Sequence, residues 1–391
     1  MSQTLQLSAA FVQTDVRRDS PRPPEFHSER YVERYDWNTL FYDVYRVGEH
    51  VVLQGPPLFN FLPELRKADI FAKAMRFPFP KARHLAMSKR GEIWFKTDLD
   101  RIAFDCPLGS FDLAVQPDQH ARFAGRRAIV TQSKNNQIRW IIDWARFHNR
   151  MHGADALLFY DNGSDIYDCA ELQRRLDEAV PEMLIQVVPW PYVFGAQGGP
   201  DWAVNGIVPD WDSDFGQVGV LQHARFRFLP QARSVLHNDI DELVIGTGNR
   251  SVFEAAEQSP TGMVKFEGRW ISVVGDGLVD TETCRHADFT LDEGADVANC
   301  PPKWCMRPQA FGRKISWGVH NVFGARCNDQ ITPEFLFRHF RGITTSWKYE
   351  RWKTEAPDTT KLVRDNDLIA AFEATGLEPG SENTARQQGR A

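Results

Sequence analysis

Two aspartates separated by a single residue are the most chemically suggestive pattern in this chain of 391 residues. Asp239 and Asp241 follow the run Ser234–Leu236, whose apolar residues predict a short buried strand. Where a chain leaves a strand, two such carboxylates can turn toward one cavity, and their oxygens suit Mg²⁺ or Mn²⁺ that also carries phosphate groups. Acidic pairs also occur in solvated turns, so it is the strand before them that favours a metal site.

A second pattern, upstream of the aspartates, predicts a β-α-β-α unit. Two short apolar runs are each followed by a polar turn and then by apolar residues at helical spacing. The expected strands are 128–132 and 156–160, and the expected helices are 138 to about 152 and a segment through 172–176. Ligands of open α/β sheets bind beyond the carboxyl ends of the strands, which makes Ser133, Lys134, Asp161 and Asp239 candidates to line one site.

A series of short motifs runs from about residue 127 to residue 353. It comprises Lys134-Asn135-Asn136, Asp143-Trp144, Phe147-His148, Gly153, Tyr160-Asp161-Asn162 with Ser164, Asp239–Glu242, Lys303-Trp304, Arg307-Pro308, Gly318-Val319-His320, Arg338-His339-Phe340 and Trp347-Lys348. In order and rough spacing this series resembles glycosyltransferase family 92 and related family-2-like transferases. The chain departs from the family pattern at Asn136, where the family has a glutamate, so an acidic role at this position is not implied.

The resemblance implies a GT-A-type nucleotide-binding sandwich, an α/β fold with a mostly parallel sheet. It implies a hexosyltransferase that moves a hexose from a nucleotide sugar, with a uridine diphosphate sugar as the first expectation, to a hydroxyl of a glycan or polysaccharide acceptor. It also implies inversion at the anomeric carbon, which requires a general base on the opposite face of the sugar. Asp276, between two glycines, is the candidate base, and a structural turn is its alternative role.

The acidic and polar candidates take separate roles in this interpretation. Ser133 and Lys134 would border the nucleotide, and Asp161 would accept a hydrogen bond from the base or the ribose. Asp239 and Asp241 would hold Mn²⁺ or Mg²⁺ on the diphosphate, because charge develops on the leaving nucleoside diphosphate.

Histidines and basic residues near the C-terminus complete the predicted site. In the fold that the resemblance implies, His339 is expected to be the third metal ligand, ahead of His320, and a buried structural histidine is the alternative. Lys303 and Arg307, with Arg341, are candidate partners of the diphosphate, because cationic side chains match phosphate oxygens. A solvated charge is the ordinary alternative for each of them.

Two other classes of protein stay open. A nucleotidyltransferase also uses paired aspartates and Mg²⁺, but it normally has a Gly-rich phosphate loop near the first strand, which residues 133–136 lack. A non-catalytic glycan-binding protein on the same fold is the second alternative, and the presence of both aspartates argues against it.

The composition of the chain changes at about residue 125. Residues 36–124 show short β-like runs broken by Gly and Pro, and they predict a small β-rich accessory domain after a lead at 1–35. Residues 125–374 are expected to form the transferase domain, and residues 375–391 a disordered tail. The segment 189–214, rich in Trp, Pro and Gly, predicts a lid or part of an acceptor groove.

Charge and hydropathy exclude other classes. The net charge of −6 and the pI near 6.0 argue against a basic face for nucleic acid. No stretch reaches the ~20 apolar residues of a membrane span, and the first residues lack the apolar segment of a secretion signal. Six cysteines without C-x-x-C spacing predict free thiols in a reducing compartment. We therefore expect a cytoplasmic protein without a transmembrane segment.

Overall fold

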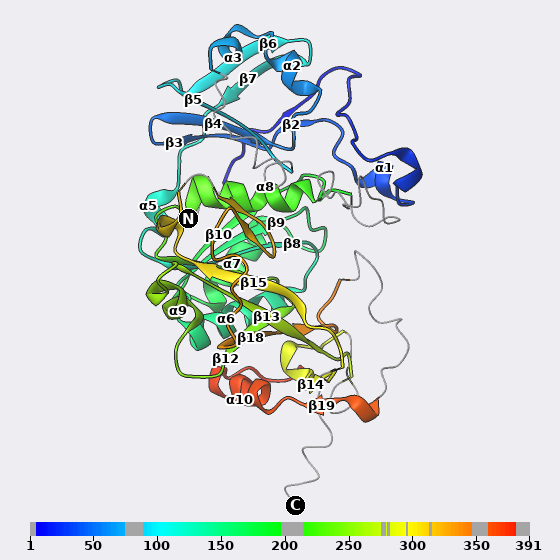
Figure 1. Cartoon of the computed structure of the whole chain (residues 1–391), viewed down its shortest axis with the longest axis vertical. Coiled ribbons are helices and arrows are strands. Elements are labelled where there is room, and N and C mark those ends of the chain that lie inside the picture. Colours follow the sequence, from blue (N-terminus) through cyan, green and yellow to red (C-terminus); the bar gives the residue numbers. More distant parts are fainter. Residues whose placement is uncertain are drawn as a thin grey trace, which may run out of the picture. The chain divides into compact units, whose positions relative to one another are not determined.

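The computed structural model describes residues 5–74, 89–196, 214–274, 279, 282–294, 296–312, 315–345 and 359–380. The chain forms two compact units (Figure 1). The first unit comprises residues 1–124, 189–231 and 313–325, and the second comprises residues 125–188, 232–312 and 326–391. A boundary thus lies between Ala124 and Gly125, where the sequence predicts the start of the transferase domain, and two later segments return to the first unit.

A ten-stranded mixed sheet organises the second unit. Its main path runs β10-β9-β8-β11-β15-β13-β14-β19, and β18 pairs with both β12 and β13. The strands are β8 (Arg127–Ser133), β9 (Ala156–Asp161), β10 (Leu184–Pro189), β11 (Ser234–His237), β12 (Glu242–Gly246), β13 (Met263–Ile271), β14 (Leu291–Asp292), β15 (Cys300–Met306), β18 (Phe335–Phe340) and β19 (Val363–Arg364).

The direction of pairing changes across this sheet. Strand β8 is parallel to β9 and to β11, and β13 is parallel to β18. Strand β15 is antiparallel to both β11 and β13, and β12 is antiparallel to β18. The predicted β-α-β-α unit and the α/β fold class are therefore confirmed. The strands beyond β11 add antiparallel pairs that the sequence did not predict.

Helices with apolar stripes bury the sheet of the second unit. They are α6 (Ile138–His152), α7 (Cys169–Ala179), α9 (Val252–Gln258) and α10 (Asn366–Thr375), with short 3-10 turns at His286–Asp288, Pro308–Ala310 and Thr359–Lys361. Trp144 and Phe147 of α6 pack with Leu157 and Phe159 of β9 in one core cluster. Helix α6 ends at Gly153, whose left-handed backbone (φ 68°) stops the helix as the sequence predicts.

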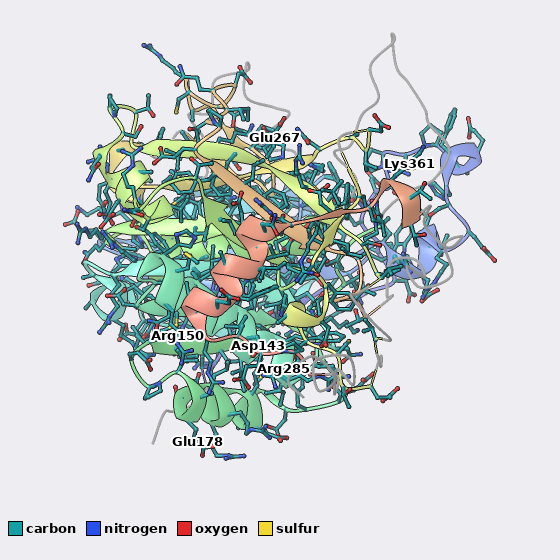
Figure 2. The ribbon with its side chains drawn as sticks, turned by 90° about the horizontal axis from the view of Figure 1, so that it is seen from below. Asp143, Arg150, Glu178, Glu267, Arg285 and Lys361 are labelled. Carbon is teal, nitrogen blue, oxygen red and sulfur yellow. The ribbon has the colours of Figure 1, made fainter. Side chains whose placement is uncertain are left out.

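A buried ion pair ties α6 to a distant segment of the second unit. The carboxylate of Asp143 is 4% exposed and accepts two hydrogen bonds from the guanidinium of Arg285, at 2.6 and 2.7 Å. Figure 2 shows the two side chains next to each other. Asp143 belongs to the motif series that carries the family resemblance, and this pair gives it a structural role.

The first unit contains smaller sheets. The three-stranded sheet β3-β4-β5 and the hairpin β6-β7 contain the short β-like runs that the sequence predicts within residues 36–124. The elements are β1 (Ala10–Phe11), β2 (Thr39–Phe41), β3 (Asp43–Val47), β4 (His50–Gly55), β5 (Gly91–Lys96), β6 (Arg101–Cys106), β7 (Gly109–Ala114), β16 (Ser316–Trp317), β17 (Val322–Phe323), a 3-10 turn (Pro24–Phe26), α1 (Tyr31–Arg34), α2 (Phe61–Leu65), α3 (Asp69–Ala74), α5 (His120–Phe123), α8 (Phe215–His223) and the π-helix Ala224–Phe228.

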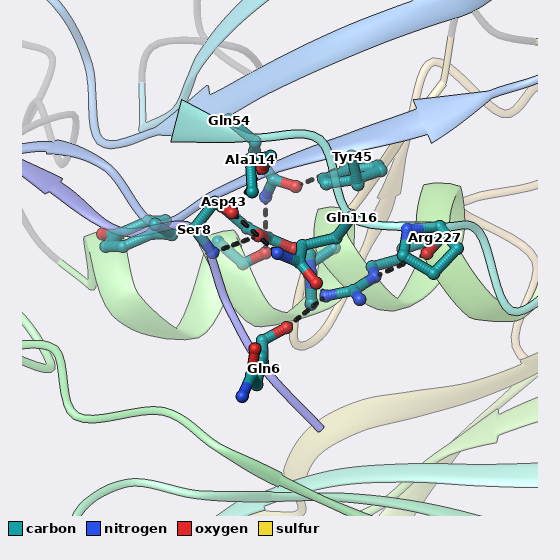
Figure 3. A network of polar contacts seen from close by, with 12 residues as sticks. Gln6, Ser8, Asp43, Tyr45, Gln54, Ala114, Gln116 and Arg227 are labelled. Atoms are coloured by element: carbon teal, nitrogen blue, oxygen red, sulfur yellow. Dashed lines mark hydrogen bonds and ion pairs between the residues drawn. The ribbon is translucent and has the colours of Figure 1, made fainter. Parts of the chain in front are cut away.

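A buried polar network holds α8 and the π-helix in the first unit (Figure 3). Asp43, fully buried, accepts hydrogen bonds from the backbone N–H of Ser8 at 2.7 Å and from Arg227 at 2.7 Å, and its other contact is His223 Nε2 at 2.9 Å. Gln54 donates to the backbone carbonyl of Gly219 at 2.8 Å. Because a buried carboxylate needs such partners, the helical segment 215–228 joins the N-terminal unit.

The remaining structural expectations have mixed outcomes. All six cysteines are free thiols, as predicted. No helix within the described ranges is long and apolar enough to cross a membrane. Most of the predicted tail and of the predicted lid, residues 381–391 and 197–213, lies outside the described residues.

We expect the second unit to lose stability as the pH falls from about 6.5 to about 4. Burial lowers the pKa of His148 to about 3 and that of His152 to about 4. In this pH range the two histidines therefore bind protons in the unfolded chain but stay neutral in the folded chain. Each histidine should reduce the free energy of unfolding by up to about 1.4 kcal/mol per pH unit.

Urea titrations at several pH values measure this slope. His152 donates from Nε2 to the carbonyl of Val244 at 2.8 Å, so His152→Gln keeps a donor but cannot titrate. The variant should show a shallower loss of stability between pH 6.5 and 4 than the wild-type protein. An unchanged slope would show that His152 does not control it.

Candidate active site

The carboxyl ends of three parallel strands bring the predicted polar residues to one edge of the sheet. His237 of β11 is opposite Val130 of β8, and Ser133 of β8 is opposite Asp161 of β9. The loop 238–242, here called the acidic loop, follows β11 directly and so lies at the same edge. This is the edge at which open α/β sheets bind ligands.

A buried lysine sits at the centre of the acidic loop. The ammonium of Lys303, from β15, is fully buried and lies 2.5 Å from Asp239 Oδ2 and 3.2 Å from Glu242 Oε2. Glu242 also accepts the backbone N–H of Asp239 at 3.0 Å. The charge on a buried ammonium is tolerated only with such partners, so Lys303 and the two carboxylates form one unit.

The three charges shift one another's proton affinity. Burial by itself would raise the pKa of Asp239, but the charges of Lys303 and His237, together with the hydrogen bond from Lys303, lower it. Burial raises the pKa of Glu242, against the opposing charge of Lys303. The two carboxylates raise the pKa of Lys303, although burial by itself would lower it. Asp239 and Lys303 are therefore an ion pair at neutral pH.

Two buried histidines support the acidic loop. His148 of α6 accepts from the side-chain amide of Asn238 at 3.2 Å, while its Nδ1–H donates to the carbonyl of Trp144 at 2.9 Å. His286 donates from Nε2 to the carbonyl of Ile240 at 2.9 Å. His148 is one of the residues that carry the family resemblance, and its contact here is with the loop rather than with a ligand.

Asp241 points to a different partner from Asp239. Its Oδ2 lies 3.0 Å from Nε2 of His339 on β18, and its carbonyl accepts the backbone N–H of Phe340 at 2.8 Å. The side chains of Asp241 and His339 are 18% and 14% exposed. Solvent can reach this pair and also Asp239, which is 30% exposed, but it cannot reach Lys303.

The described residues contain no group of three or more His, Cys, Asp or Glu side chains arranged to hold a metal ion. Of the predicted ligand set Asp239, Asp241 and His339, Asp239 is paired with Lys303, and its role as a metal ligand stays a prediction. Asp241 and His339 do fit as two ligands. Adjacent ligands at about 2.1 Å from an octahedral ion are about 3.0 Å apart, which is the separation of their two donor atoms.

The predicted nucleotide residues form a tightly bonded turn. Both oxygens of Asp161 accept from Ser164, one from its hydroxyl at 2.5 Å and one from its backbone N–H at 3.0 Å. The hydroxyl of Ser164 also accepts the backbone N–H of Asn135 at 2.8 Å. Ser133 accepts from the amide of Asn136 at 2.8 Å, and Lys134 is exposed at the same edge. The turn therefore joins the ends of β8 and β9.

The two predicted diphosphate partners, Lys303 and Arg307, lie at different positions along β15, Lys303 within the strand and Arg307 directly after it. Lys303 is buried and engaged with the acidic loop. Arg307 follows Met306, which is opposite Val235, so Arg307 lies beside the amino end of β11. At about 3.3 Å per residue, that end is roughly 16 Å from Asp239. The diphosphate role of Lys303 and Arg307 stays a prediction.

The other predicted residues divide between the two units. Arg341 lies two residues beyond His339 and pairs with Glu293 at 2.5 Å. His320 belongs to the first unit, whereas His339 belongs to the second. Asp276, the predicted general base, lies outside the described residues.

Sequence reasoning missed one side chain of the site. The indole of Trp270, on β13, stacks on the imidazole of His339 with ring centroids 4.2 Å apart and planes 23° apart. Trp270 stands in no recognisable motif, so only the pairing of β13 with β18 reveals its position.

Comparisons with known proteins add little to this geometry. No family model matches the chain, and no curated protein matches it. The solved structures that match include a mannosyltransferase from Pyrobaculum calidifontis in complex with GDP-mannose and Mn²⁺. The identity is 16%, the match covers 39% of this chain and 38% of that one, and the TM-score is 0.24. Membership of glycosyltransferase family 92 and the GT-A type of fold therefore stay predictions.

Replacing Lys303 with Met keeps most of the side-chain volume but removes the charge that neutralises Asp239 and Glu242. We expect the free energy of unfolding to fall by about 3 kcal/mol, because buried carboxylates would lose their partner. Denaturant titration at pH 7 measures this change.

The exposed Lys134, at the same edge of the sheet, provides a matched control. Lys134→Met should change the free energy of unfolding by less than about 0.5 kcal/mol. Losses of equal size in the two variants would contradict the importance of the buried ion pair.

Proposed function

We propose that this protein is a metal-dependent glycosyltransferase that moves a hexose from a nucleotide sugar to a hydroxyl of a glycan. The observation that carries the proposal is the pair Asp241 and His339, which solvent can reach. Asp241 lies in the acidic loop, which the buried side chains of Lys303, His148 and His286 hold in place. A carboxylate and an imidazole at this separation suit a divalent ion that takes its other ligands from phosphate and water.

The residues at this edge of the sheet would have different roles in the proposed reaction. Asp241 and His339 would hold Mn²⁺ or Mg²⁺, which when bound neutralises charge on the leaving diphosphate. Lys303 would hold the acidic loop in one conformation without metal, and Asp239 would pair with Lys303 rather than with the ion. Ser133, Lys134 and the turn at Asp161 would border the nucleotide.

The finer points of the proposal come from the family resemblance. The expected donor is a uridine diphosphate sugar, the expected outcome is inversion, and Asp276 is the expected general base. A thermal-shift screen of nucleotide sugars with and without Mn²⁺ tests the donor, because a ligand that binds only the folded state raises the melting temperature. Release of the nucleoside diphosphate in the presence of glycan acceptors tests transfer, and a screen without any metal-dependent shift would refute the proposal.

The variants Asp241→Asn and Asp239→Asn separate the two aspartates. Asp241→Asn should abolish the Mn²⁺-dependent rise in melting temperature caused by uridine diphosphate, with little change in the metal-free protein. Asp239→Asn should instead lower the melting temperature of the metal-free protein, since it removes the negative charge that pairs with the buried ammonium of Lys303. A metal-dependent rise that persists in Asp241→Asn and disappears in Asp239→Asn would reverse the assignment.

The turn at Asp161 makes a separate prediction. Asp161→Ala should weaken the binding of uridine diphosphate by about 1–3 kcal/mol, because a charge-assisted hydrogen bond is lost and the turn loses its acceptor. Ser164→Ala keeps the carboxylate but removes the hydroxyl that donates to it, and we expect it to weaken binding less. Calorimetry with unchanged affinity in both variants would remove this turn from the nucleotide site.

A further inference from the structure

Hydrogen bonds fix only one end of the imidazole of His339. Nε2 lies 3.0 Å from Asp241, whereas Nδ1 is buried and has no hydrogen-bond partner within the described part of the chain. The nearest carboxylate to Nδ1, that of Glu242, is 3.8 Å away. Because the torsion that turns an imidazole ring has a broad energy profile, a single hydrogen bond leaves the plane of the ring poorly determined.

The ring plane is defined by Trp270 instead. Trp270 and His339 are partners in the parallel register of β13 and β18, so their side chains lie on the same face of the sheet. The two rings stack with centroids 4.2 Å apart. Stacking restricts the imidazole to a plane nearly parallel to the indole, in which Nε2 meets Asp241.

The other face of the indole is also covered. The guanidinium carbon of Arg341 lies 4.1 Å from the centroid of the Trp270 ring. Two groups this close to one centroid fit only on opposite faces, so Trp270 lies between Arg341 and His339. Arg341 is held in turn by Glu293, at 2.5 and 2.9 Å. An indole with both faces occupied has none left for stacking on a sugar.

We propose that Trp270 is a positioning residue for the metal site. It holds the imidazole of His339 so that Nε2 and Asp241 face the same ion, and Arg341 with Glu293 holds the indole from behind. This inference rests on the proposed function. Residues that orient a metal ligand typically change metal affinity by about 10–100-fold when they are replaced.

The test measures Mn²⁺ binding directly, in the presence of uridine diphosphate and without acceptor, because the proposed site takes its other ligands from phosphate and water. Electron paramagnetic resonance of free Mn²⁺ gives the dissociation constant of the full-length protein and of its variants. Trp270→Leu removes the flat ring and should raise the dissociation constant about 10-fold. Trp270→Phe keeps an aromatic face and should restore most of the affinity, a rescue that loss of bulk alone does not predict.

The double variant Trp270→Leu with His339→Ala shows whether Trp270 acts through His339. In the absence of the imidazole, Trp270→Leu should have no further effect on Mn²⁺ affinity. The control is Trp94→Leu, because Trp94 is also a partly buried tryptophan in a strand, and it meets Phe226 edge-to-face at 4.9 Å in the first unit. This control should leave Mn²⁺ affinity unchanged.

The outcomes distinguish the two proposals. Wild-type protein that fails to bind Mn²⁺ would refute the proposed function, and this inference with it. Wild-type binding that is unchanged in Trp270→Leu, or weakened equally in Trp270→Leu and Trp94→Leu, would refute the positioning role alone. A loss in Trp270→Leu that persists at full size in the His339→Ala background would do the same.

Discussion

The burial of the Lys303 ammonium between Asp239 and Glu242 is the interaction on which the candidate site depends. Taking these charges out of water is strongly unfavourable unless they meet with good geometry. Strand β15, the end of β11 and the start of β12 must therefore assemble together. Once Asp239 is bound to Lys303, the turn directs Asp241 toward β18, where His339 lies. One ion pair thus gives the two aspartates different partners, and both carboxylates stay partly exposed.

Two buried histidines at the same edge hold the residues that flank Asp239. His148 and His286 are buried and hold Asn238 and Ile240, on either side of Asp239. Both contacts use a neutral imidazole, which a buried site favours because it disfavours the charged form. The side chains that carry the family resemblance therefore serve in part to keep the acidic loop in one conformation. A preorganised loop can hold its ligand groups without reorganising when a ligand arrives.

Predictions from the sequence succeeded where the signal is local. The strand, helix and turn pattern from Arg127 to Asp161 appears in the structure within a residue or two, because apolar spacing reports burial along one element. The partners of long side chains were harder to predict. Lys303 and Arg307 occupy one short segment, yet the antiparallel register of β15 on β11 sends them to opposite edges of the sheet. The sequence also did not predict that residues 189–231 belong to the first unit, because this depends on the distant ion pair of Arg227 with Asp43.

The sequence by itself determined the α/β fold class, the order of strands and helices around the first strand ends, and the presence of an acidic pair after a buried strand. Only the tertiary structure decided that Asp239 pairs with Lys303 and Asp241 with His339. It also decided that Trp270 stacks on the imidazole of His339. The reason is physical. Local periodicity is set by neighbouring residues, whereas the partner of a charge or a ring depends on the register of strands that are far apart in the chain.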